Sequence, residues 1–235
     1  MVYAAILAGG KGTRMGGDLP KQFLPLHGTP ILIHTVRQFV TCDAVDRTVI
    51  CVPAAYIDDT RALLERYSDL RGKADVIAGG ADRTGSLENA CDFFLSLRPA
   101  EDDDILITHD CVRPFVTHAM ILASVEAARQ YGGATAAVPS VDTICVSRDG
   151  AVIDSVPDRT ELYSVQTPQT FRMKSFCDIL RSLTPEEKSR VTDASAVLRL
   201  RNLPVALSLG DNANLKITHP SDIPLAEAVL AMRNG

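Results

Sequence analysis

The sequence predicts an α/β fold with a mostly parallel β-sheet between two layers of helices. Short apolar runs of strand length alternate with longer segments whose apolar residues recur at helical spacing. The first apolar run leads directly into the glycine-rich stretch "LAGGKGTRMGG". The alternation breaks once, where two short alternating runs flank Asp149-Gly150, and this pattern indicates a β-hairpin.

Each expected element follows from the local pattern. Buried-strand runs occur at residues 2–8, 47–53, 74–80, 104–110, 134–140 and 204–210. Helical periodicity occurs at residues 29–40, 58–68, 86–97, 117–133, 175–183, 192–202 and 219–233. Right-handed crossovers between such strands give a Rossmann-like three-layer arrangement. Because we find no linker, repeat or low-complexity tract, we expect one domain over residues 1–235, with a projecting β-arm at about 141–158.

Composition narrows the class of protein. With 235 residues and 46% hydrophobic content, the chain can bury a sizeable core. Its net charge of -5 makes nucleic acid an unexpected partner, so any anionic ligand needs local cations. The six cysteines form no C-x-x-C pair or zinc-like spacing, which favours a reducing compartment. We expect no signal peptide and no membrane span, and therefore a cytoplasmic protein.

Glycines and cations gather where the expected strands end. The segments are "GGKGTRMG", "GGADRTGS", "HDCVRP" and "DNANLKIT". Open parallel sheets bind ligands at the carboxyl ends of their strands. Glycines let backbone N–H groups approach a phosphate closely, and cations neutralise its charge. The pattern therefore favours a polyphosphate ligand.

The best-known phosphate-binding motifs do not match. A P-loop requires Lys-Ser/Thr after its last glycine, whereas Gly12 follows Lys11. The dinucleotide fingerprint G-x-G-x-x-G requires glycine where Met15 stands. These mismatches argue against a kinase or an NAD-linked reductase. Taken alone, the glycine-rich turn is equally consistent with a tight strand-to-helix turn that binds nothing.

A chain of motifs gives a more specific indication. "LAGGKGTRMG" followed by "PKQFLPL" resembles the signature of sugar-type nucleotidyltransferases, specifically the cytidylyltransferases that activate polyol phosphates. "GGADRTGS", "THDCVRPF", "VPDR", "QTPQTF", "TDASAVL" and "NLKIT" resemble the later blocks of that family, in the same order. The resemblance covers nearly the whole chain. It implies transfer of CMP from CTP to a polyol phosphate, with pyrophosphate as the second product.

Two acceptors are implied by this resemblance. The opening "LAGG" and the block "TDAS" resemble the enzymes that use D-ribitol 5-phosphate and form CDP-ribitol. The alternative acceptor is 2-C-methyl-D-erythritol 4-phosphate, whose enzymes usually have an Ala-Ala-Gly opening and a Thr-Asp-Glu-Ala block. A non-catalytic nucleotide-binding protein is the alternative from another class.

The resemblance also implies a nucleotide site with a divalent cation. Residues that follow the first and third expected strands, in "LAGGKG" and "GGADRTGS", resemble the nucleotide-binding blocks, namely Leu7, Ala8, Gly9, Gly10, Lys11, Gly12, Gly80, Ala81, Asp82, Arg83 and Ser86. Ser86 is alternatively an N-cap of the following helix, and Lys11 a loop lysine. Asp110 resembles the aspartate associated with Mg²⁺, or else caps a turn. Arg113 lies near the nucleotide or pairs with Asp110, and His109 is structural.

The catalytic and acceptor residues are implied in the same way. Arg14 and Lys21 resemble the cations that stabilise the transition state, although Lys21 is alternatively a surface lysine. Arg159 and Lys216 resemble the residues that orient the acceptor phosphate, with further contacts from Thr143, Thr167 and Thr192. In this family the arm exchanges contacts across a homodimer, so Arg159 and Thr143 are expected in either their own or the neighbouring site.

Overall fold

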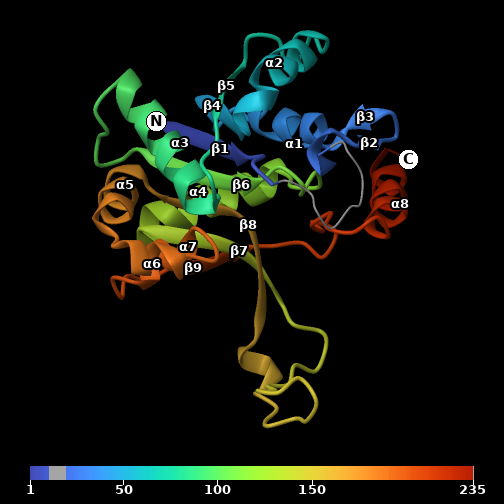
Figure 1. The fold of residues 1–235 in the computed structure, drawn as a ribbon, viewed down its shortest axis with the longest axis vertical. Coiled ribbons are helices and arrows are strands. Elements are labelled where there is room, and N and C mark those ends of the chain that lie inside the picture. The colour runs from blue at the N-terminus through green and yellow to red at the C-terminus, as the bar shows by residue number, and fades with distance from the viewer. Residues whose placement is uncertain (11–19, 235) are drawn as a thin grey trace.

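A seven-stranded β-sheet forms the middle layer of the structure, a computed structural model that describes residues 1–10 and 20–234 (Figure 1). The strand order is β5-β4-β1-β6-β8-β7-β9. The strands are β1 (Val2–Leu7), β4 (Arg47–Val52), β5 (Ala74–Ala78), β6 (Ile105–Asp110), β7 (Gly133–Pro139), β8 (Tyr163–Arg172) and β9 (Ala206–Leu209). All pairs are parallel except those that β8 makes with β6 and β7. The mostly parallel α/β sheet is therefore confirmed.

Helices cover both faces of the sheet, because central strands such as β1 bury apolar side chains on both sides. Every residue of β1 is buried, with Ala4 and Ile6 in one core and Tyr3 and Ala5 in the other. The first core includes residues of α1 (Ile31–Val40), α2 (Ile57–Glu65), α4 (His118–Tyr131) and α8 (Asp222–Asn234). The second includes residues of α3 (Arg83–Leu97), α5 (Met173–Ser182) and α7 (Ser195–Arg199). Within the described residues, none of the helices has the length and apolar character needed to cross a bilayer.

Strand β8 was not expected from the sequence. It runs antiparallel between β6 and β7 and carries buried Gln166, Thr167 and Gln169, so its pattern lacks an apolar run. Pro168 has no backbone N–H, and the β7–β8 register shifts beside it, between Thr135 and Ala137. A long strand with buried polar residues and an internal proline does not resemble an apolar buried strand, which explains the omission.

Several element boundaries also differ from expectation. Helix α3 begins at Arg83 because Asp82 is its N-cap and accepts a hydrogen bond from the Gly85 backbone N–H. The alternative that Ser86 is the N-cap is therefore wrong. The helix expected at 192–202 is limited to α7, and the unexpected α6 (Pro185–Ser189) begins with a capping box at Thr184. Short strands β2 (Pro25–Leu26) and β3 (Thr29–Pro30) precede α1.

The expected hairpin projects from the sheet as an arm (Figure 1). It leaves from the ends of β7 and β8, where Pro139 pairs with Tyr163. The β-hairpin expected around Asp149-Gly150 is confirmed, although within 142–156 its pairing is limited to one isolated antiparallel bridge, Val146 to Ser155. Residues 141–156 are all exposed, so no core packs against the alternating side chains to hold a ladder.

Candidate active site

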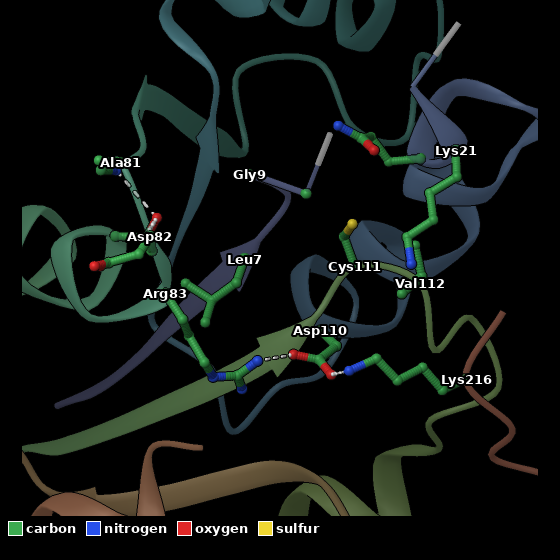
Figure 2. Close-up of a pocket in the computed structure, with 14 residues that line it drawn as sticks. Leu7, Gly9, Lys21, Ala81, Asp82, Arg83, Asp110, Cys111, Val112 and Lys216 are labelled. Carbon is green, nitrogen blue, oxygen red and sulfur yellow. Dashed lines mark hydrogen bonds and ion pairs between the residues drawn. The ribbon is translucent and has the colours of Figure 1, made fainter. Parts of the chain in front are cut away.

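A cleft of about 490 Å³ opens at the carboxyl ends of the central strands (Figure 2). Leu7 ends β1, Asp110 ends the adjacent β6, and Gly80 lies just beyond the end of β5, which β4 separates from β1, so residues from three parallel strands meet at the same edge. This is the edge at which parallel sheets bind ligands. The predicted residues that line the cleft are Leu7, Gly9, Gly10, Lys21, Gly80, Ala81, Asp82, Arg83, Ser86, Asp110 and Lys216.

Asp110 is held between two cations in this cleft. Its Oδ1 accepts a hydrogen bond from Arg83 Nη1 at 2.6 Å, and its Oδ2 lies 2.8 Å from Lys216 Nζ (Figure 2). The carboxylate is buried, which opposes ionisation. The charges of Arg83 and Lys216 outweigh that burial and hold the pKa of Asp110 well below its usual range. Asp110 is therefore a carboxylate at every physiological pH.

Two backbone segments, at Gly80 and at Gly85, approach each other closely at the edge of the cleft. A Cβ added to Gly80 would lie 2.3 Å from the Gly85 carbonyl carbon, so only glycine permits this approach. Ser86 Oγ accepts a hydrogen bond from the Gly80 N–H at 3.0 Å and donates to Asp82 O at 2.9 Å. The segment between β5 and α3 is thereby folded tightly at the entrance to the cleft.

Lys21 reaches the cleft from a short 3₁₀ helix, Lys21–Phe23. Its Nζ donates to the Ile217 carbonyl at 3.3 Å, so it lies beside the segment that carries Lys216. The neighbouring Gln22 is buried and donates from Nε2 to Ala8 O at 2.8 Å, which fixes the 3₁₀ helix against the end of β1. Lys21 is therefore part of the cleft wall rather than a remote surface lysine.

Other predicted residues lie outside the cleft lining. Ala8 and Thr167 are buried behind it, and Thr167 Oγ1 accepts from the Asp110 N–H at 3.2 Å. Thr192 is exposed beside α7. Thr143 and Arg159 are exposed on the arm, where Arg159 Nη1 donates to Val141 O. Three further predicted residues, Lys11, Gly12 and Arg14, lie outside the described residues.

Arg113 and His109 support the cleft from behind. Within the described residues, the ion-pair partners of Asp110 are Arg83 and Lys216, so the expected alternative pairing with Arg113 is wrong. Arg113 Nη1 instead donates to the Asn214 carbonyl at 2.8 Å. His109 is buried, its Nε2 lies 3.1 Å from Arg113 O, and burial lowers its pKa to about 4. His109 is neutral at physiological pH, in agreement with a structural role.

Three lining residues were not predicted: Gln22, Cys111 and Val112. Each is the chain neighbour of a predicted residue, Lys21, Asp110 or Arg113, so extending the prediction by one position would have included all three. Burial raises the pKa of the Cys111 thiol to about 12, so the thiol stays protonated and does not act as a nucleophile.

A single carboxylate beside cations suits Mg²⁺ bound together with a polyphosphate. Each Asp110 oxygen accepts one contact from a cation and keeps a second lone-pair direction. Mg²⁺ commonly uses one or two carboxylates, phosphate oxygens and several waters. The described residues contain no cluster of three or more His, Cys, Asp or Glu able to hold a metal by themselves. The donor set therefore fits a metal that depends on the nucleotide phosphates.

Comparison with known protein families identifies the class of enzyme to which this chain belongs. The family model described as 2-C-methyl-D-erythritol 4-phosphate cytidylyltransferase matches residues 2–232. The chain belongs to this family. It is accordingly a CTP-dependent cytidylyltransferase, and the readings as an NAD-linked reductase or a non-catalytic protein are not supported.

Solved structures agree with this assignment. The 4-diphosphocytidyl-2C-methyl-D-erythritol synthase from Anaerococcus prevotii matches with a TM-score of 0.80 at 26% identity, over 98% of this chain and 96% of that chain. The 2-C-methyl-D-erythritol 4-phosphate cytidylyltransferase from Thermus thermophilus matches with a TM-score of 0.74 at 26% identity, over 98% and 100% of the two chains. The cytidylyltransferase thus has the same fold as these proteins, and the match covers nearly the full length of both chains.

Proposed function

We propose that this cytidylyltransferase, acting as a single domain, transfers CMP from CTP to 2-C-methyl-D-erythritol 4-phosphate. The observation that carries the chemistry is the grouping of Lys21, Arg83, Asp110 and Lys216 in one cleft at the carboxyl edge of the sheet. The acceptor is supported by the matched family and by the solved structures, whose names refer to this compound or its product.

The proposed reaction is an in-line displacement. An oxygen of the acceptor phosphate attacks the α-phosphorus of CTP, the bond to the β-phosphate oxygen breaks, and pyrophosphate leaves with its electron pair. No proton transfer is needed, because the attacking phosphate oxygen is already anionic. Catalysis of this kind depends on positioning and on charge stabilisation.

We assign the cations of the cleft by their positions. Lys21 and Arg14 would stabilise the charge that develops on the α-phosphate and the leaving pyrophosphate. Lys216 would bind the acceptor phosphate, since its ammonium enters the cleft from the C-terminal segment. Arg83 already occupies Asp110 Oδ1 and would keep that carboxylate oriented. Asp110 would hold Mg²⁺ with the nucleotide phosphates, and the metal would neutralise phosphate charge.

The nucleotide would lie against backbone rather than side chains. Leu7, Gly9 and Gly10 on one wall, and Gly80 and Ala81 on the other, leave main-chain groups accessible. Such groups can hydrogen-bond the edge of a cytosine ring, and Ser86 is near enough to Gly9 and Gly80 to contact the base or ribose.

D-Ribitol 5-phosphate is the second candidate acceptor, on the basis of the "LAGG" opening and the "TDAS" block. In the structure the Asp193 carboxylate of that block accepts from Gln169 Nε2 at 2.8 Å and from the Ala196 N–H at 3.0 Å. These bonds fix α7 to strand β8. The "TDAS" block would therefore affect the choice of acceptor only indirectly, through the position of the backbone of α7.

A competition assay separates the two acceptors. The enzyme is incubated with CTP, Mg²⁺ and equal concentrations of both phosphates, and the CDP products are resolved by mass spectrometry. A large excess of CDP-methylerythritol is the expected result. Predominant CDP-ribitol would refute the proposed acceptor while keeping the chemistry, and absence of both products would refute the chemistry.

We also propose that the arm completes the cleft of a second copy in a homodimer. Arg159 and Thr143 are exposed and do not line the cleft of their own chain. The arm also exposes Val141, Val152 and Ile153 at 73%, 66% and 62%, and apolar side chains this exposed are typical of an interface. The proposal is that Arg159 of the partner subunit contacts the acceptor phosphate.

Subunit complementation tests this arrangement. Arg159→Ala and Lys21→Ala are each expected to inactivate the homodimer, and a mixed dimer would regain one intact cleft. Verified heterodimers prepared with two affinity tags should therefore recover part of the activity. Heterodimers with no more activity than the parent variants would show that each cleft uses its own arm.

A further inference from the structure

The segment that carries Lys216 has no regular secondary structure. Residues 210–221 follow β9 and precede α8 without forming a helix or a strand. Lys216 is nevertheless held with its Nζ 2.8 Å from Asp110 Oδ2, although its side chain is 42% exposed. Some other set of contacts must place this ammonium, because neither a helix nor a sheet ladder fixes the backbone here.

Asn214 supplies most of these contacts from within the protein, in addition to the bond that the Ile217 N–H donates to Val112 O at 2.9 Å. Asn214 is fully buried, and its Nδ2 donates to Thr167 O at 2.9 Å and to Gln166 Oε1 at 3.2 Å. Its backbone carbonyl accepts from Arg113 Nη1 at 2.8 Å, and its backbone N–H donates to Asp211 O at 2.9 Å. Asn214 is thus tied to β8, to the segment after β6 and to its own turn.

These contacts link both partners of the ion pair in the cleft. Thr167 accepts from Asn214 through its carbonyl and from the Asp110 N–H through Oγ1. One residue of β8 therefore sets Asp110 and the Lys216 segment at a fixed separation. Gln166 fixes the same turn from its other side, since its amide donates to Asp211 O at 2.9 Å and accepts from the Asp211 N–H at 3.3 Å.

We infer that Asn214 is a positioning residue that fixes the Lys216 ammonium at Asp110, acting through Thr167 and Gln166. The inference rests on the proposed function only in assigning the acceptor phosphate to Lys216. Loss of the Asn214 amide removes the bonds to Thr167 O and Gln166 Oε1. Among the described residues it leaves only the Gln166–Asp211 bonds between the side chains of β8 and this segment, so Lys216 samples positions away from the cleft. The expected consequence is weaker acceptor binding with unchanged CTP binding.

The first test compares Asn214→Leu with a matched control, Thr170→Val. Both replace a buried polar side chain by an apolar one of similar size. Thr170 lies on β8, as Gln166 and Thr167 do, but it donates to Ser124 Oγ of α4, away from the turn. Asn214→Leu should raise the KM for the acceptor about 10-fold, with the KM for CTP unchanged. Thr170→Val should change neither. Equal increases in both KM values for Asn214→Leu would overturn the inference.

A double-variant cycle shows whether Asn214 acts through Lys216. In a Lys216→Gln background, adding Asn214→Leu should leave kcat/KM almost unchanged, because the group that it positions is gone. A further loss equal to that seen in the wild-type background would overturn the inference. Gln166→Leu acts on the same turn from β8, and it replaces Asn214→Leu in the cycle if the latter does not fold.

A chemical readout separates this inference from the proposed function. Lys216 is acylated with an amine-directed reagent, and its labelling is measured by peptide mass spectrometry relative to Lys174. Asn214→Leu should increase labelling of Lys216 several-fold, whatever the acceptor is. If Lys216→Gln is fully active, the assigned role of Lys216 fails, and this labelling alone decides the positioning role. Unchanged labelling would overturn it.

Discussion

Lys216 lies with its Nζ 2.8 Å from Asp110 Oδ2, although the two residues come from an irregular C-terminal segment and from the end of a central strand. Arg83 occupies the other carboxylate oxygen. The cleft thus contains a buried anion neutralised by two cations, one of which is partly exposed. The ion-pair contacts among these three charged groups can rearrange when a polyphosphate and a metal bind in the cleft.

Replacing Asp110 tests this charge arrangement. Asp110→Asn keeps the size of the side chain but removes the anion that faces Arg83 and Lys216 and that we propose as the Mg²⁺ ligand. We expect the rate of CMP transfer to fall by about 10²–10³. Pyrophosphate release is measured across a Mg²⁺ titration, with circular dichroism as the control for folding. A folded Asp110→Asn variant with near wild-type turnover would contradict the assignment.

Lys21 and Lys216 are expected to affect different kinetic constants. Lys21→Ala should lower kcat by about 10²–10³ with CTP still bound, since its cation acts mainly on charge that develops in the transition state. Lys216→Ala should mainly raise the KM for the acceptor. Steady-state kinetics with each substrate varied separately distinguishes these patterns. The same change in kcat and KM for both variants would contradict separate roles for Lys21 in the transition state and Lys216 in acceptor binding.

The close approach of Gly80 to Gly85 predicts a strong effect from a single methyl group. Gly80→Ala places a Cβ 2.3 Å from backbone carbon of Gly85, so the segment between β5 and α3 must move and CTP binding should be lost. Gly72→Ala is the control, because Gly72 precedes β5, away from the cleft lining, and its added Cβ meets nothing within 4 Å among the described residues. Calorimetric titration with CTP compares the two. Normal binding by Gly80→Ala would exclude this segment from the nucleotide site.

Burial of His109 predicts a specific pH dependence of stability. The folded-state pKa is lowered to about 4, whereas an unfolded histidine titrates near 6.5. Between these values the unfolded chain binds a proton that the folded chain does not. Stability is therefore highest above pH ~6.5 and falls as the pH drops toward 4, by about 3 kcal/mol from this group.

The variant His109→Gln keeps a donor for Arg113 O and removes the titrating ring. Urea unfolding at pH 7 and pH 4.5, with a chelator present, should show a smaller decrease in the free energy of unfolding for His109→Gln than for the wild type. An identical decrease in both proteins would show that His109 is not the group responsible.

The cleft was largely predictable because it follows from strand ends. Parallel strands place Leu7, Gly80 and Asp110 at one edge, and the glycines and cations after them point to phosphate. Strand β8 was not predictable, since its buried Gln166 and Gln169 are satisfied by residues far along the chain. Hydrophobic periodicity detects apolar burial, and it gives no signal for a buried amide whose partner is distant in sequence.

Local sequence patterns also did not predict which charged side chains pair with one another. Arg113 follows Asp110 closely, and proximity in sequence suggested an ion pair. In the fold, the turn after β6 directs Arg113 to the Asn214 carbonyl, while Arg83 and Lys216 reach Asp110 from other segments. The side chains that neutralise a buried carboxylate depend on backbone direction after a strand, which the sequence alone does not specify.

The central claim is that this cleft transfers CMP from CTP to a polyol phosphate. The most direct measurement quantifies pyrophosphate and the CDP-polyol together, from CTP, Mg²⁺ and 2-C-methyl-D-erythritol 4-phosphate, for the wild type and for Lys21→Ala. We predict equal amounts of the two products with the wild type and little of either with Lys21→Ala. A folded wild-type protein that binds CTP but releases no pyrophosphate with this acceptor or with D-ribitol 5-phosphate would contradict the claim.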